Sequence, residues 1–171
     1  MARKNSLREY QTAVAERLRN LSKEEPSALS KLGFQAGGHF WFVALNDVSE
    51  VIPVPTLAPV PLTKPYFCGL TNIRGSLYGV VDFSLFLGEA TAPSGVDSRL
   101  LLLPQAMVQG AAILVNRMAG LKNVEGFTST ARPHDVPAWV RGVYTDAEGT
   151  AWRELDARML AEDMDFINVA R

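Results

Sequence analysis

The chain has few of the side chains that most often carry catalysis or bind metals. It contains one cysteine and two histidines. Cys68 has no partner for an internal disulfide, and His39 and His134 stand beside a predicted turn and between prolines, where surface or capping roles are expected. CxxC, HExxH, Walker and GxGxxG motifs are missing from the sequence. We therefore predict no catalytic residue, no metal site and no cofactor.

An imbalance of charge and a long apolar run are missing as well. Lys and Arg number 17 and Asp and Glu 18, so the formal net charge of −1 gives little attraction to nucleic acid or anionic lipid. No apolar run approaches the roughly 20 residues that cross a bilayer. The charged start of the chain does not resemble a signal peptide. These features predict a cytoplasmic protein that reaches a membrane only through its partners.

The composition that remains is typical of a globular, core-forming protein. Apolar residues make up 47% and charged residues 20% of the 171 positions. Such a composition lies well away from that of disordered chains. The length fits one compact domain, or two small subdomains that share a core.

The first segment of the chain has the pattern of an amphipathic helix. A capping box of Ser6 and Glu9 begins it and Pro26 ends it. The apolar stripe runs at spacings of three and four along Leu7, Tyr10, Val14, Leu18 and Leu21. We assign residues 1–30 to an N-terminal helical extension and 31–171 to the main domain. The stripe either packs on the domain body or recruits a partner helix, and the sequence does not separate these alternatives.

Strand patterns dominate from residue 32 onward. A first hairpin is predicted around Gly37-Gly38, followed by a short helical turn over 46–51 with Asn46 as its cap. Prolines between residues 53 and 65 then predict an extended connector at a sheet edge. Two further strands are predicted at Leu100–Leu103 and Ala111–Val115.

The segment Gly69–Asp82 is the most informative part of the chain. Two apolar runs, 70–74 and 77–81, flank Gly75-Ser76, which we predict to form the turn of a β-hairpin. The hairpin places Arg74 at a strand end, where its planar guanidinium suits a carboxylate or backbone carbonyls. An ordinary hairpin with a solvated arginine fits this pattern equally well.

A weak internal repeat of about 70 residues suggests two similar β-units. Each copy has a proline-aromatic entry, at Pro65 and Pro137, then a glycine, a hairpin and a closing aspartate. Asp82 and Asp156, the two closing residues, are predicted to cap short helices rather than to form a catalytic carboxylate pair. Two such units would leave strand edges and a groove that suit protein partners.

Three segments together resemble the CheW-like coupling proteins of bacterial chemosensory systems. They are FWFVALNDVSEVIPVP, VPLTKPYFCGLTNIRGSLYGVVDFSLFLG and AWVRGVYTDAEGTAWRELD, and the resemblance runs from about Lys31 to Leu160. Its most specific part is the N-x-R-G turn formed by Asn72, Arg74 and Gly75. The N-terminal helix pattern and the sequences FWF and VVDFSLFLG are most similar to the branch of the family that serves type IV pilus twitching motility.

This resemblance implies a mainly β fold, with two five-stranded SH3-like barrels around a joint hydrophobic core and short connecting helices. It implies a non-enzymatic adaptor that binds the regulatory domain of a CheA-type histidine kinase and the cytoplasmic tip of a methyl-accepting chemoreceptor. Such a protein would be cytoplasmic and held near the membrane by receptor complexes. Asn72, Arg74 and Gly75 would lie at the partner-binding region. The opposite charges in the two most family-like segments further predict Glu50 as the acidic partner of Arg74 and as part of that region.

Two departures and three alternatives accompany the resemblance. Asn116-Arg117-Met118 stands where the family has a valine-aspartate-arginine pattern, and the tail DFINVAR beyond the resemblance is either a final strand or part of a contact. The second repeat ends in WRELD, where the family has an apolar run, so Arg153 and Glu154 predict an exposed edge strand. A scaffold of a flagellar or another chemosensory pathway is the first alternative. The others are a β-barrel that binds a small ligand or oligonucleotide, and an enzyme that uses Asp82, Arg74 and His39, whose spacing gives no reason to bring them together.

Overall fold

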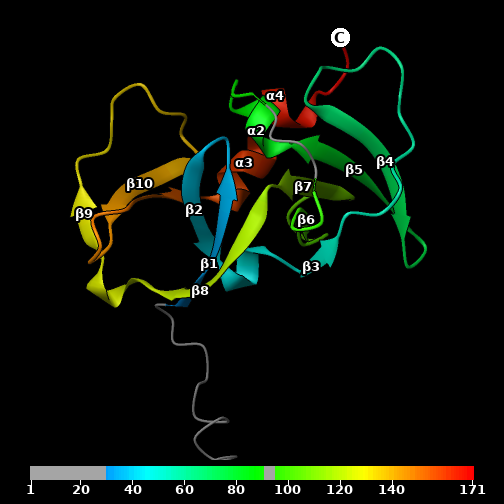
Figure 1. Cartoon of the computed structure of the whole chain (residues 1–171). Coiled ribbons are helices and arrows are strands. Elements are labelled where there is room, and N and C mark those ends of the chain that lie inside the picture. The colour runs from blue at the N-terminus through cyan, green and yellow to red at the C-terminus, as the bar shows by residue number, and fades with distance from the viewer. Residues whose placement is uncertain (1–29, 91–94) are drawn as a thin grey trace, which may run out of the picture.

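The computed structural model describes residues 30–90 and 95–171, which form two β-sheets lying side by side with short helices along one side between them (Figure 1). The predicted helix over residues 6–24 lies outside the described residues. Sheet A contains β1 (Ser30–Ala36), β2 (His39–Ala44), β8 (Arg117–Asn123), β9 (Thr128–Thr130), β10 (Val140–Thr145) and β11 (Ala151–Leu155). Sheet B contains β3 (Glu50–Pro53), β4 (Phe67–Ile73), β5 (Ser76–Asp82), β6 (Arg99–Leu102) and β7 (Ala111–Val115).

Helical segments are short and follow the strands. They are the 3-10 turns η1 (Leu45–Asp47) and η2 (Val124–Gly126) and the helices α2 (Phe83–Phe86), α3 (Ala157–Glu162) and α4 (Met164–Ile167). The predicted cap at Asn46 is wrong, because η1 is capped by Ala44 without a side-chain bond and the chain returns to extended backbone at β3. As predicted, Asp82 caps α2 and Asp156 caps α3 through their carboxylates.

The strand orders of the two sheets correspond to each other. Sheet B runs β3-β6-β7-β5-β4, and sheet A runs β8-β1-β2-β11-β10 with the short β9 added at its end. In each sheet one parallel pair, β5 with β7 or β11 with β2, joins a hairpin to a three-stranded antiparallel group. The two-unit architecture predicted from the sequence is therefore confirmed, although sheet A has six strands. The units are not consecutive halves, because the whole of sheet B is inserted between β2 and β8.

The internal repeat corresponds to the hairpins β4–β5 and β10–β11. Each first strand has a register shift near its start, at Phe67/Gly69 and at Val140/Gly142. The N–H of Asp82 donates to the carbonyl of Tyr66, and the N–H of Asp156 donates to that of Trp139, both at 2.8 Å. Matching backbone bonds identify Tyr66 with Trp139 and Asp82 with Asp156.

The apolar side chains form one core between the sheets and a smaller one within sheet B. Strands such as β6 are buried on both faces, which explains their continuous apolar sequences. Leu101 points into the joint core with Trp41 and Phe83, whereas Leu100 and Leu102 point into the sheet B cluster. In sheet A, a cluster of aromatic side chains takes the place that the smaller cluster has in sheet B. Its members are Phe40, Phe42, Phe127, Tyr144 and Trp152. The joint core ties the two units together.

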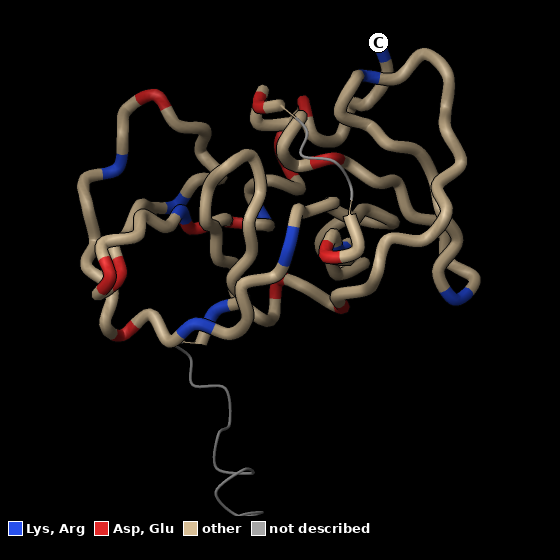
Figure 2. The backbone as a smooth tube through the Cα atoms, in the orientation of Figure 1, with Lys and Arg blue, Asp and Glu red and all other residues tan. Residues whose placement is uncertain are grey.

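Charged residues of both signs are scattered over both sheets, in keeping with the small net charge (Figure 2). This interspersed arrangement of charges in residues 30–90 and 95–171 is not the one-sided basic pattern that is typical of nucleic-acid-binding proteins.

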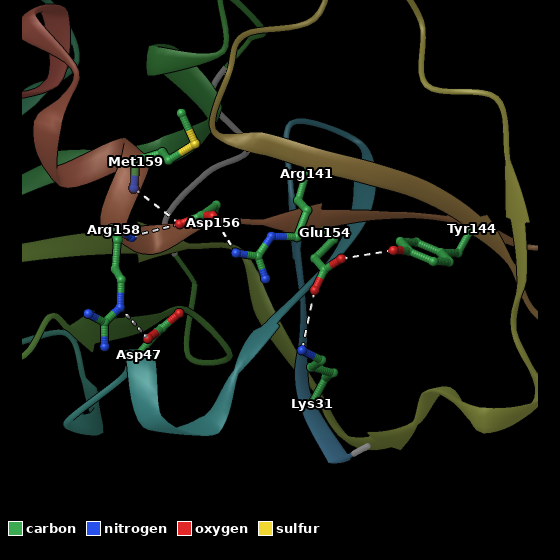
Figure 3. A network of polar contacts seen from close by, with 8 residues as sticks. All are labelled: Lys31, Asp47, Arg141, Tyr144, Glu154, Asp156, Arg158 and Met159. Carbon is green, nitrogen blue, oxygen red and sulfur yellow. Dashed lines mark hydrogen bonds and ion pairs between the residues drawn. The ribbon is translucent and has the colours of Figure 1, made fainter. Parts of the chain in front are cut away.

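The prediction that Arg153 and Glu154 form an exposed edge is wrong. Strand β11 lies between β2 and β10, so both of its edges are paired. Glu154 is buried, and its carboxylate lies 3.2 Å from the ammonium of Lys31 and accepts a 2.9 Å bond from the hydroxyl of Tyr144 (Figure 3). Burial, and then this carboxylate, raise the pKa of Tyr144. The guanidinium of Arg153 lies over the Trp41 ring, 5.5 Å from its centre. Arg153 and Glu154 are therefore tolerated in a central strand because each has a favourable partner for its charge.

Candidate functional site

The tip of the β4–β5 hairpin holds three of the residues predicted to bind partners. Ile73 pairs with Ser76, so the two turn residues are Arg74 and Gly75 instead of the predicted Gly75-Ser76. Both adopt left-handed backbone, with φ of 51° and 86°, as a two-residue turn that follows the strand twist requires. The side-chain oxygen of Asn72 accepts the N–H of Gly75 at 2.9 Å and supports the turn.

Arg74 forms a two-pronged ion pair with Glu50. Its two terminal nitrogens donate to the two carboxylate oxygens at 2.8 and 2.7 Å. Glu50 lies on β3 and Arg74 at the end of β4, which are the two outermost strands of sheet B. The pair therefore joins opposite edges of the sheet, and it shows that sheet B curls back on itself like a barrel.

The exposure of this pair leaves it little weight in folding stability. The Arg74 side chain is 77% exposed and that of Glu50 32%, and an exposed ion pair contributes only about 0.2–1 kcal/mol to folding. The carboxylate engages two of the five guanidinium N–H donors and thereby fixes the plane of the guanidinium. The hairpin tip thus presents an oriented cation on a projecting turn.

An apolar groove of about 370 Å³ lies along the other side of the same hairpin. Leu70, Leu77 and Val81 line it from β4 and β5, and the C-terminal segment lines it with Phe166, Ile167 and Val169. Leu77 is 59% and Ile167 50% exposed. An exposed apolar surface of this kind beside a polar tip is typical of a protein-docking face. Leu77 was predicted only as a strand residue of this hairpin. The C-terminal tail was predicted to be a final strand or part of a contact, and the structure places Phe166 and Ile167 in α4 and, with Val169, beside the groove.

The other candidate chemical groups of the sequence do not converge. Asp82 accepts the N–H of Leu85, and burial raises the pKa of its carboxyl. His39 lies 3.7 Å from Glu89 and its side chain is 36% exposed, and His134 is in an exposed loop. Arg74 is bound to Glu50. The structure therefore gives each of Asp82, Arg74 and His39 a different neighbour and a different element.

Cys68 lies half-buried on β4 beside the sheet B cluster. Burial, and then the nearby Asp82 carboxylate, raise the pKa of its thiol, which lowers its nucleophilicity near neutral pH. Within residues 30–90 and 95–171 no group of three or more His, Cys, Asp or Glu is placed to hold a metal ion. Over the same ranges no helix is long and apolar enough to span a membrane.

Comparison with known proteins agrees with this architecture. The family model of the CheW-like domain matches residues 31–164, and the chain belongs to the CheW-like domain family. The chain is also similar to Protein PilI of Pseudomonas aeruginosa, with 26% identity over 152 residues that cover 86% of this chain and 84% of PilI. The crystal structure of the scaffolding protein TtCheW from Thermoanaerobacter tengcongensis matches with a TM-score of 0.66 and 18% identity, over 78% of this chain and 87% of that one. The last comparison shows the shared fold.

Proposed function

We propose that this protein is a non-enzymatic adaptor that couples methyl-accepting chemoreceptors to a CheA-type histidine kinase. Membership of the CheW-like family and the likeness to a scaffolding protein support an adaptor role. The similarity to PilI favours the chemosensory system that controls type IV pilus twitching motility over a flagellar pathway. Both partners are inferred from membership of the CheW-like family.

The observation that carries the proposal is the β4–β5 hairpin tip. Arg74, Gly75, Asn72 and Glu50 together form an exposed, oriented polar turn, and an apolar groove lies next to it. A polar rim beside an apolar centre is the usual composition of a protein interface. We assign partner contact to the Arg74 guanidinium, with Glu50 holding its orientation.

A charge-swap series tests this assignment. The wild type, Arg74→Glu, Glu50→Arg and the double swap are measured for binding to a kinase regulatory domain and to a receptor cytoplasmic fragment. Arg74→Glu should weaken binding to at least one partner by about tenfold, because an interface cation is replaced by an anion. The double swap restores the internal ion pair but not the cation at the tip, so it should remain defective.

Arg132→Glu serves as the matched control. Arg132 is exposed in the loop before β10 of sheet A and bonds only backbone carbonyls there. Recovery of binding in the double swap would show that the pair has a structural role alone. Failure of the folded wild type to bind either partner would overturn the adaptor proposal itself.

A further inference from the structure

The two proline-aromatic entries of the internal repeat meet at one pocket. Tyr66, which precedes β4, and its repeat equivalent Trp139, which precedes β10, both line a pocket of about 390 Å³. Phe86 of α2 completes the aromatic lining. The Tyr66 and Phe86 rings are perpendicular at 5.1 Å between centres, and those of Phe86 and Trp139 are 5.8 Å apart. Three aromatic rings, packed against one another, therefore line one pocket at the junction of the two units.

The same pocket carries an excess of negative charge. Its charged lining residues are Lys64, Asp163 and Asp165. Asp163 caps α4 by accepting the N–H groups of Asp165 and Phe166, while the Asp165 side chain is 83% exposed. Aromatic faces and carboxylates both attract cations, and their combination is the usual composition of sites for organic ammonium and guanidinium groups.

A cation of the chain itself already belongs to the pocket lining. The ammonium of Lys64 lies 5.7 Å from the centre of the Tyr66 ring and 3.2 Å from a carboxylate oxygen of Asp165. Tyr66 in turn donates its hydroxyl proton to the backbone carbonyl of Asp165, which ties the ring to α4. This resident ammonium shows which chemistry the surroundings accept, and Asp163 and Asp165 together exceed its charge by one.

We propose that this pocket, lined by Tyr66, Phe86, Trp139, Asp163 and Asp165, binds an organic cation, with Lys64 as an internal competitor. The proposal is independent of the hairpin tip and of the adaptor role. The cation is an alkylammonium or guanidinium group, carried either by a free small molecule or by a lysine or arginine side chain of a protein partner.

The test is a titration of the full chain followed by NMR of the Trp139 indole N–H. Choline and its uncharged isostere 3,3-dimethylbutan-1-ol form a matched pair of probes, and N-acetyl-arginine amide represents a protein side chain. Choline should shift the resonance saturably and bind about fivefold or more tightly than the isostere, because the rings and carboxylates attract its charge. Tighter binding of the arginine compound than of choline assigns the site to a protein side chain, and the reverse assigns it to a free amine.

Two variants separate this site from a merely structural cluster. Asp165→Asn should weaken choline binding about threefold or more, since it removes an exposed carboxylate without altering the core. Lys64→Gln should tighten it by a similar factor, because it removes the competing ammonium. Equal binding of choline and the isostere, or unchanged or weaker choline binding in folded Lys64→Gln, would overturn the proposal.

Discussion

Asp146 shows how one side chain organises the turn between β10 and β11. Its carboxylate accepts the indole N–H of Trp152 at 2.9 Å and the backbone N–H groups of Glu148 and Thr150 at 3.0 and 2.8 Å. The Trp152 bond is the first cause that lowers the pKa of Asp146, and the backbone bonds add to it.

This lowered pKa predicts a pH dependence. Because the folded-state pKa lies below that of the unfolded chain, the stabilisation is present above the unfolded pKa of about 4 and is lost as the pH falls through the folded value. Urea unfolding between pH 6 and pH 3 should therefore show a smaller loss of stability in Asp146→Asn than in the wild type. Glu148→Gln, a neighbouring exposed residue whose side chain makes no described bond, is the control. An identical pH profile for the wild type and Asp146→Asn would contradict the prediction.

Equivalent residues of the repeat carry different chemistry. Asp156 is paired with Arg141 at 2.7 Å, whereas Asp82 has Cys68 at the corresponding place beside it.

The position of Arg74 next to Glu50 was predictable from opposite charges in two family-like segments. The burial of Glu154 was not, because its partners Lys31 and Tyr144 come from distant strands and only the strand order brings them together.

Gly69 allows the β4–β5 hairpin to lie directly against the proline-containing connector. It has φ of 129°, and a Cβ there would overlap the carbonyl of Ala58, which exchanges two backbone bonds with Leu70. The proline-containing connector is thereby held against the outer edge of β4, as the proline spacing predicted. The sequence showed that the connector lies at an edge but not which residue it pairs with.

Substitution of Gly69 should accordingly be severe. Gly69→Ala combines a strained backbone with a backbone overlap, and we expect about 3 kcal/mol or more of destabilisation. Gly149→Ala in the other hairpin has a similar strain, with φ of 85°, but open space around the new methyl group. It should cost about 1 kcal/mol. Equal effects of the two substitutions on the urea midpoint would show that the connector moves away from the new methyl group at little cost in stability.

One strand and one turn show what a sequence pattern can and cannot specify at the scale of an element. Strand spans such as 111–115 were predicted correctly, because fully buried strands have continuous apolar sequences. The hairpin turn was predicted one residue late, because Arg74 itself adopts the left-handed backbone that glycine usually supplies. The support from Asn72 offsets that cost and is visible only in the folded turn.

At the scale of the whole molecule, the joint core makes the two units interdependent. Leu101 of sheet B packs there with Trp41 and Trp139, which lie in or beside sheet A. Two units of this size, each marginal alone, should unfold together. The sequence predicted the shared core from length alone but not the insertion of one unit into the other, which depends on strand order.

A core substitution tests this coupling. Leu101→Ala in sheet B should lower the free energy of unfolding by about 2–5 kcal/mol. The unfolding transition followed by tryptophan fluorescence should shift together with the one followed by far-ultraviolet circular dichroism. The three tryptophans lie in β2, in β11 and just before β10. Leu121→Ala, at a position 63% exposed, should have little effect. Separate transitions for the two signals would mean that the units fold independently.

The parallel pairing of β2 with β11 also has a consequence for synthesis of the chain on the ribosome. Trp41 and Arg153 are neighbours in the sheet although they lie more than a hundred residues apart. The open edge of β2 must therefore wait, unpaired, while all of sheet B is translated, and contacts of such long range slow folding. During that interval sheet B can assemble first, and the nascent first hairpin is the part of the protein that most needs protection from aggregation by a chaperone.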